Sequence, residues 1–181
     1  FGLLAAGLVY TLQYNHKINQ DLANQQMHQQ LAAHLASDLS LWPTSGLDFN
    51  AVKEAFHVMM IIGPAIELYV TDPEGNILAY DAPEEIIKRR QIDVNKITAF
   101  SAIEHTLNQP IYGIDPRSEA VHKVFSAAPI QQNGTLKGYL YIIIGGQEYD
   151  QVWSAISDNQ NLKDMVLLAL VLMLALFLCT L

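Results

Sequence analysis

The chain has 181 residues, with 18 Asp and Glu against 10 Lys and Arg, and its formal net charge is −8. Hydrophobic residues make up 51% of it, which is too apolar for an intrinsically disordered chain. The acidic balance and the absence of a long basic run argue against nucleic-acid binding. Every Asp, Glu, Lys and Arg lies between Lys17 and Asp164, so the sequence predicts one globular domain between two apolar ends.

The two apolar ends have the composition of membrane helices. Residues 165–181 hold no charge, Pro or Gly, and as a helix they would reach roughly 25 Å, against about 30 Å for a bilayer core. We predict two transmembrane helices, of which this sequence holds only part, at 1–14 and 163–181, with residues 15–162 as the domain between them. The single cysteine, Cys179, lies in the second apolar run, which excludes an internal disulfide framework.

The N-terminal part of the domain is predicted to be helical. Residues 11–37 lack Pro and Gly, so we expect one long helix that continues from the first apolar end. Its apolar stripe is thin and is interrupted by Gln25, Gln26, Gln29 and Gln30. A stripe of this kind suits a weak, partly polar pairing, and we therefore expect a homodimer through this helix. A second helix should begin at a cap formed by Asp48 or Ser45 and end at Gly63-Pro64.

The first of two expected β-hairpins follows. Along residues 65–71 the side chains alternate, with Ile66, Leu68 and Val70 on one face and Glu67, Tyr69 and Thr71 on the other. Asp72-Pro73-Glu74-Gly75 has the residues of a type I turn, and residues 76–81 form the returning strand.

A second hairpin is expected at strands 120–130 and 135–144, joined by Gln131-Gln132-Asn133-Gly134. Its second strand is nearly all apolar, which is typical of a central strand. Residues 82–106 should be helical or irregular, with Lys88-Arg89-Arg90 on a solvated face, and a last helix should begin at Gln147. The order of elements predicts an α+β domain, a small antiparallel sheet with helices on one side.

Four segments carry a resemblance to a known family: Ile66 to Gly75 (IELYVTDPEG), Asp115-Pro116-Arg117, Val124 to Ile130 (VFSAAPI) and Gly138 to Gly146 (GYLYIIIGG). They resemble the extracytoplasmic sensor region of bacterial membrane sensor histidine kinases, over about residues 60–150. Within it the order of elements is similar to PAS-like periplasmic domains of the PDC or Cache group. The resemblance implies a PAS-like antiparallel sheet, a homodimer, and an inner-membrane protein with this domain in the periplasm.

The function implied by the resemblance is signal input in a two-component system. The domain would detect an extracytoplasmic stimulus and transmit it through the second transmembrane helix to a cytoplasmic kinase. The chain has no phosphorylation box and no glycine-rich ATP loop, so we expect no enzyme activity from it, although the full-length protein would be a histidine kinase. The alternatives are the input domain of a chemoreceptor or diguanylate cyclase, and a membrane-anchored scaffold that binds a partner protein.

In similar sensors the ligand lies over the sheet and is held by the later strands and the loop before them. That comparison gives eight candidate ligand-binding residues here: Tyr80, Tyr112, Arg117, His122, Lys123, Ser126, Tyr139 and Tyr141. Because alternate residues of a strand face opposite sides, His122 and Ser126 cannot share a face with Lys123. The expected ligand is a carboxylate or an amino acid, with a partner protein as the alternative.

Two interpretations of Arg117 stay open. Its planar guanidinium would bind a ligand carboxylate, or Asp115-Pro116-Arg117 would lock a loop through an internal ion pair. The six histidines and the lone cysteine show no metal-ligand spacing, so no metal and no cofactor are expected. A divalent-cation bridge to anionic lipid is a further alternative, carried by the scattered acidic residues Glu84, Glu85, Asp150, Asp158 and Asp164.

Overall fold

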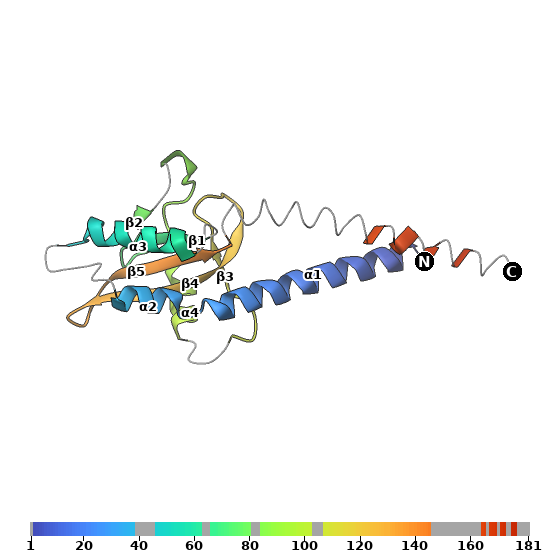
Figure 1. Ribbon diagram of the computed structural model, residues 1–181, viewed down its shortest axis with the longest axis horizontal. Helices are drawn as coiled ribbons and strands as arrows, with labels where there is room; N and C mark the ends of the chain where they lie inside the picture. The colour runs from blue at the N-terminus through green and yellow to red at the C-terminus, as the bar shows by residue number, and fades with distance from the viewer. Residues whose placement is uncertain are drawn as a thin grey trace.

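The computed structural model describes residues 2–38, 46–62, 66–80, 84–102 and 107–145, and short pieces between 164 and 176. In these residues the chain forms an α+β fold, as predicted: a curled, five-stranded antiparallel sheet with a long N-terminal helix, α1 (Gly2–Met27), that extends away from it (Figure 1).

The sheet has the strand order β2-β1-β5-β4-β3, and every pairing is antiparallel. Its strands are β1 (Ile66–Thr71), β2 (Ile77–Tyr80), β3 (Tyr112–Ile114), β4 (His122–Gln132) and β5 (Thr135–Ile144). The apolar strand β5 lies in the centre, between β1 and β4, as its composition predicts. The three-residue strand β3 was not predicted, because so short a run has no alternation to detect.

Both predicted hairpins are confirmed, and their turns explain how β1 is aligned with β2 and β4 with β5. The backbone N–H of Gly75 donates to the carbonyl of Asp72 at 3.1 Å, and the Asp72 carboxylate accepts from the N–H groups of Glu74 and Asn76. In the second turn Asn133 and Gly134 both have positive φ, at 50° and 76°. Two consecutive positive φ angles define the type I′ turn that fits the twist of a hairpin.

The single long helix predicted over 11–37 is wrong at residues 28–30, where a turn separates α1 from α2 (Leu31–Asp38). The cause lies on β4, where the Ser126 hydroxyl donates to the carbonyl of Gln29 at 3.0 Å and accepts from the N–H of Ala32 at 3.1 Å. This side chain takes over backbone groups that a continuous helix would pair internally.

The second helix, α3 (Phe49–Ile62), begins as predicted. Asp48 caps it, because its Oδ1 accepts from the N–H groups of Asn50 and Ala51 at 2.9 and 3.3 Å. Ser45 and Gly63-Pro64 lie outside the described residues. The irregular stretch that follows the first hairpin contains a 3-10 turn, η1 (Glu84–Ile86), and helix α4 (Val94–Ser101).

The expectation of helices on one side of the sheet is wrong, because both faces are covered. On one face, which we call the helical face, α2 and α3 pack on the sheet around the buried residues Ala32, Leu35, Val52, Ala55, Leu68, Val70, Ala79, Ala128, Ile130, Leu140 and Ile142. On the other, which we call the loop face, α4 and the segments 84–93 and 107–121 pack around Tyr69, Ile87, Ile92, Ile97, Phe100, Leu107, Phe125, Ala127, Tyr139, Tyr141 and Ile143.

The described part of the chain holds no helix that is both long and apolar enough to cross a membrane. The helix predicted from Gln147 and most of residues 163–181 lie outside the described residues. In α1 the large apolar side chains Leu8, Tyr10, Leu12 and Tyr14 are exposed.

Candidate functional site

The eight candidate ligand residues separate into three groups in the structure. Tyr80, Lys123, Tyr139 and Tyr141 lie on the loop face, and Arg117 reaches the same side from the loop between β3 and β4. Tyr112 and Ser126 hold the N-terminal helices instead: the Tyr112 hydroxyl donates to Asp21 Oδ2 at 2.8 Å, and Ser126 bonds to the turn between α1 and α2. His122 is exposed at the edge of the sheet.

The tyrosines of the loop face belong to its core. Tyr139 and Tyr141 are buried, the Tyr141 ring lies 5.0 Å from that of Phe125, and its hydroxyl donates to the carbonyl of Ile114 at 2.9 Å. Burial raises the pKa of Tyr141 strongly, so this hydroxyl stays protonated and remains a hydrogen-bond donor. Both rings belong to the buried cluster that includes Ile97 and Phe100 of α4, so a ligand would meet them only if the layer over the sheet moved.

A buried carboxylate, which sequence reasoning missed, lies beside them. Glu67 of β1 is 4% exposed at its side chain, and its Oε2 accepts from the Tyr69 hydroxyl at 2.8 Å. The same oxygen lies 3.2 Å from Nε of Arg117, whose side chain is 20% exposed. Burial and then Glu67 raise the pKa of Tyr69, which keeps its hydroxyl a donor to the carboxylate. Arg117 therefore binds a carboxylate, that of the chain's own Glu67.

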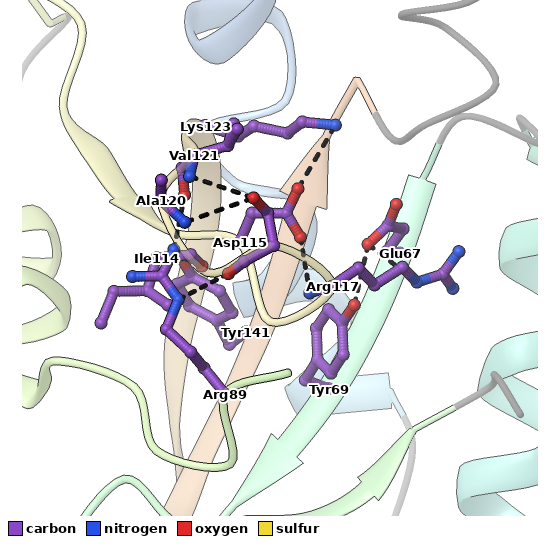
Figure 2. Close-up of polar contacts among 11 residues, drawn as sticks. Glu67, Tyr69, Arg89, Ile114, Asp115, Arg117, Ala120, Val121, Lys123 and Tyr141 are labelled. Carbon is purple, nitrogen blue, oxygen red and sulfur yellow. Dashed lines mark hydrogen bonds and ion pairs between the residues drawn. The ribbon is translucent and has the colours of Figure 1, made fainter. Parts of the chain in front are cut away.

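A second ion pair lies next to the first (Figure 2). Asp115 Oδ1 accepts from the backbone N–H of Arg117 at 2.8 Å, and its Oδ2 lies 3.5 Å from Nζ of Lys123. The side chains of Asp115 and Lys123 are 2% and 9% exposed. Asp115 thus locks the loop, but its ion partner is Lys123, whereas the guanidinium of Arg117 pairs with Glu67.

Arg89 holds the outer side of the same loop. Its Nε donates to the carbonyl of Ser118 and its Nη2 to the carbonyl of Val121, both at 2.7 Å, as Figure 2 shows in part. The backbone N–H groups of Lys88 and Arg89 both donate to the carbonyl of Pro116. The expectation of a solvated basic face is therefore wrong for Arg89, which binds the loop. Arg90 does lie exposed, in an ion pair with Glu84.

The four charged groups Glu67, Asp115, Arg117 and Lys123, which we call the charge network, lie at one end of the sheet. Glu67 pairs across the ladder with Ile143, next to the last residue of β5. The network therefore connects the loop after β3 with the end of the central strand, where the chain leaves the sheet. Removing one member of a buried ion pair is costly, so loss of any member of the charge network is expected to destabilise this end of the sheet.

No other site stands out in the described part of the chain. A shallow depression of about 410 Å³ lies by the first turn of α4, lined by Glu74, Gln91, Ile92, Asp93, Val94, Asn95 and Ile114, and none of the eight candidate residues lines it. Among the described residues, no three His, Cys, Asp or Glu side chains lie together as metal ligands would.

Comparisons of this chain with protein families, with curated proteins and with solved structures found no match.

Proposed function

We propose that this domain is the signal-input domain of a bacterial membrane sensor histidine kinase, held at the inner membrane with its sheet in the periplasm. The observation that carries the proposal is the attachment of α1. This helix is about 39 Å long at 1.5 Å per residue, and among the described side chains the contacts to the sheet and to the segment before β3 come from near its C-terminal end: Asp21, Leu22, Gln25 and Gln26. A rigid rod that is fixed at one end to a sheet can carry a movement of that sheet to a distant point.

The positions of the two ends support a membrane anchor. The start of α1 and the described residues between 164 and 176 lie at the same end of the molecule's long axis (Figure 1). We propose that the apolar segments 1–14 and 163–181 are the parts embedded in the bilayer, with Tyr10 and Tyr14 near its surface. The exposed apolar side chains of α1 would then lie in lipid or against a second copy, in a homodimer formed through this helix.

The sheet supports the PAS-like part of the proposal. Its first and last strands lie side by side in the centre, and the segment with α4 is inserted between β2 and β3. In the similar PAS-like sensors the ligand lies on one face of the sheet, held by the later strands and the loop before them. That face is the loop face here, and it holds the charge network.

For the stimulus we propose a carboxylate or an amino acid that competes with Glu67 for Arg117. The planar guanidinium suits a carboxylate, and its present partner shows that one can be accommodated at this position. Displacement of Glu67 would release β1 beside the end of β5, and so change the point from which the chain leaves the sheet. A ligand shifts such an equilibrium only by its difference in affinity for the two states.

A thermal-shift screen of the whole chain in detergent micelles, against carboxylates and amino acids, tests this proposal. A ligand at a hundred times its dissociation constant should stabilise the domain by about 2.7 kcal/mol. We expect this stabilisation to disappear in Arg117→Ala and to persist in the control Arg90→Ala, which removes an exposed guanidinium from a surface ion pair. Glu67→Gln should strengthen binding, because it weakens the internal competitor. A hit that survives Arg117→Ala would contradict the assigned site, and no hit at all would contradict a small-molecule stimulus.

A further inference from the structure

The contact between α1 and the sheet centres on one buried side chain, Gln25. It is fully buried, and its Nε2 donates to the carbonyls of Ile111 and Phe125 at 2.9 and 2.8 Å. Its Oε1 accepts from the N–H of Ile111 at 2.8 Å. A single side-chain amide therefore satisfies three backbone groups, two on Ile111 and one on Phe125 of β4.

Gln25 occupies the place of the next rung in the ladder between β3 and β4. The register pairs Tyr112 with Val124 and Gly113 with Lys123, so one further step would pair Ile111 with Phe125. The amide of Gln25 bonds to these two residues instead. We infer that the ladder stops here because a side chain of α1 is inserted into it: β3 begins at Tyr112, whereas β4 continues through Phe125.

Two neighbouring side chains hold the same segment. Gln26 Nε2 donates to the carbonyl of Leu107 at 2.6 Å, and Asp21 accepts from the Tyr112 hydroxyl. Residues 107–112 are thus bound to α1 at both of their ends and at Ile111. A movement of this segment toward β4 would have to break these hydrogen bonds, and a movement of α1 would break the same ones.

We infer that the contact between α1 and the sheet has two states, and that the side-chain amide of Gln25 holds α1 in one of them. When this amide leaves the ladder, α1 moves relative to the sheet. In the state described here the amide is inserted; in the other, Ile111 pairs directly with Phe125 and α1 is released. Both states satisfy these backbone groups, whereas an intermediate position leaves them unpaired, which is unfavourable. The contact is therefore discrete rather than continuously deformable. Its use in signalling rests on the proposed sensor function, but its existence does not.

The test measures the position of α1 in the full chain, in detergent micelles. With Cys179 replaced by Ser, spin labels are placed on cysteines at the exposed positions Asn19 of α1 and Gln131 of β4, and the distance between them is measured by pulsed electron paramagnetic resonance. Hydrogen exchange of the Ile111 amide is followed in the same samples. Three variants are compared. Gln25→Leu removes the side-chain amide, and Gln25→Asn keeps an amide on a side chain that is one carbon shorter. The control is Gln30→Leu, at an exposed glutamine.

We expect Gln25→Leu and Gln25→Asn to shift the distance by at least about 1.5 Å, the rise of one helical residue, or to add a second distance, and Gln30→Leu to leave it unchanged. The Ile111 amide should remain protected in both Gln25 variants, because Phe125 becomes its partner. An unchanged distance in a folded Gln25 variant, or exchange of Ile111 at the rate of an unprotected amide, would overturn the inference. Because no ligand is involved, a failed ligand screen would count against the proposed stimulus and leave this result standing.

Discussion

The two faces of the sheet are built from alternate residues of the same strands, and they differ in chemistry. On the helical face, Leu68 and Val70 of β1 and Leu140 and Ile142 of β5 form an apolar core with α2 and α3. On the loop face, their neighbours Glu67, Tyr69 and Tyr141 add carboxylate and hydroxyl groups to a second apolar cluster, which includes Ile143. The alternation of strand residues thus gives each face an apolar cluster, and it adds buried tyrosine hydroxyls and the Glu67 carboxylate to the loop face.

The difference indicates what each face can do. Apolar packing on the helical face is non-directional and depends on buried area, so no small molecule competes with it. Ion pairs and hydrogen bonds on the loop face have specific partners, and a ligand with the same groups can replace one of them. Both faces therefore contribute apolar packing, and the loop face also holds ion pairs and hydrogen bonds that a competing group could replace.

The largest loss of unfolding free energy is expected for a substitution on the helical face. Leu140 is fully buried, so Leu140→Ala should lower the free energy of unfolding by about 2–5 kcal/mol, through lost burial and the cavity left behind. Chemical denaturation measures this loss. The control is Leu136→Ala, on the same strand but only partly buried against the loop-face core. A loss at Leu136 equal to that at Leu140 would break the contrast between the faces.

On the loop face, Arg117→Ala should lower the free energy of unfolding by about 3 kcal/mol, because it leaves the Glu67 carboxylate buried without its ion partner. The double variant Glu67→Gln/Arg117→Ala should recover part of this loss, since the remaining group is neutral. Denaturation of both single variants and the double variant gives the coupling free energy. A coupling near zero would mean that the pair contributes nothing specific.

The buried tyrosines give the loop face its own pH dependence. Burial raises the pKa of Tyr69 and Tyr141 in the folded state, whereas in the unfolded chain these groups titrate near 10. Their contribution is fully present below about pH 10 and is lost as the pH rises further, by about 1.4 kcal/mol per pH unit for each ring. Tyr141→Phe should reduce this alkaline slope, measured by melting at several pH values. An alkaline slope in Tyr141→Phe equal to that of the unchanged protein would contradict this origin of the pH dependence.

The smallest loss of unfolding free energy is expected at the start of α3, the helix that packs on the helical face. Asp48→Ala removes the acceptor for two N–H groups at the start of α3 and should cost about 1 kcal/mol of unfolding free energy. Asp48→Asn should retain most of the stability, because Asn also caps. The loss should leave the alkaline slope unchanged, and a changed slope would mean that the two faces are more strongly coupled than their contacts suggest.

The parts of the fold that were predictable are those fixed by local chemistry. Asp72 and Gly75 define one turn, Asn133 and Gly134 the other, and the apolar run of β5 marks the centre of the sheet. The break after α1 was not predictable, because Ser126, which causes it, lies 97 residues from Gln29. A sequence pattern reports only on residues that are neighbours along the chain, whereas this interruption of the helix is caused by a tertiary contact.

The site shows the same limit. Arg117 and Lys123 could be named from the sequence, but their partners could not, since Glu67 was expected simply on the polar side of an alternating strand. Nothing local indicates that a second layer covers that side. The glutamines of α1 were expected only to interrupt its apolar stripe, and their partners within the chain could not be predicted: Gln25 bonds to Ile111 and Phe125, and Gln26 bonds to Leu107.

Hydrogen exchange of the backbone amides, resolved by residue in the full chain, tests most directly whether one face holds the fold while the other can move. We predict that amides of residues 107–121 and of α4 exchange through local openings of low free energy. Amides of β1, β5 and α2 should exchange only through global unfolding. Equal opening free energies for both sets would contradict the account, because the loop face would then be as fixed as the core behind it.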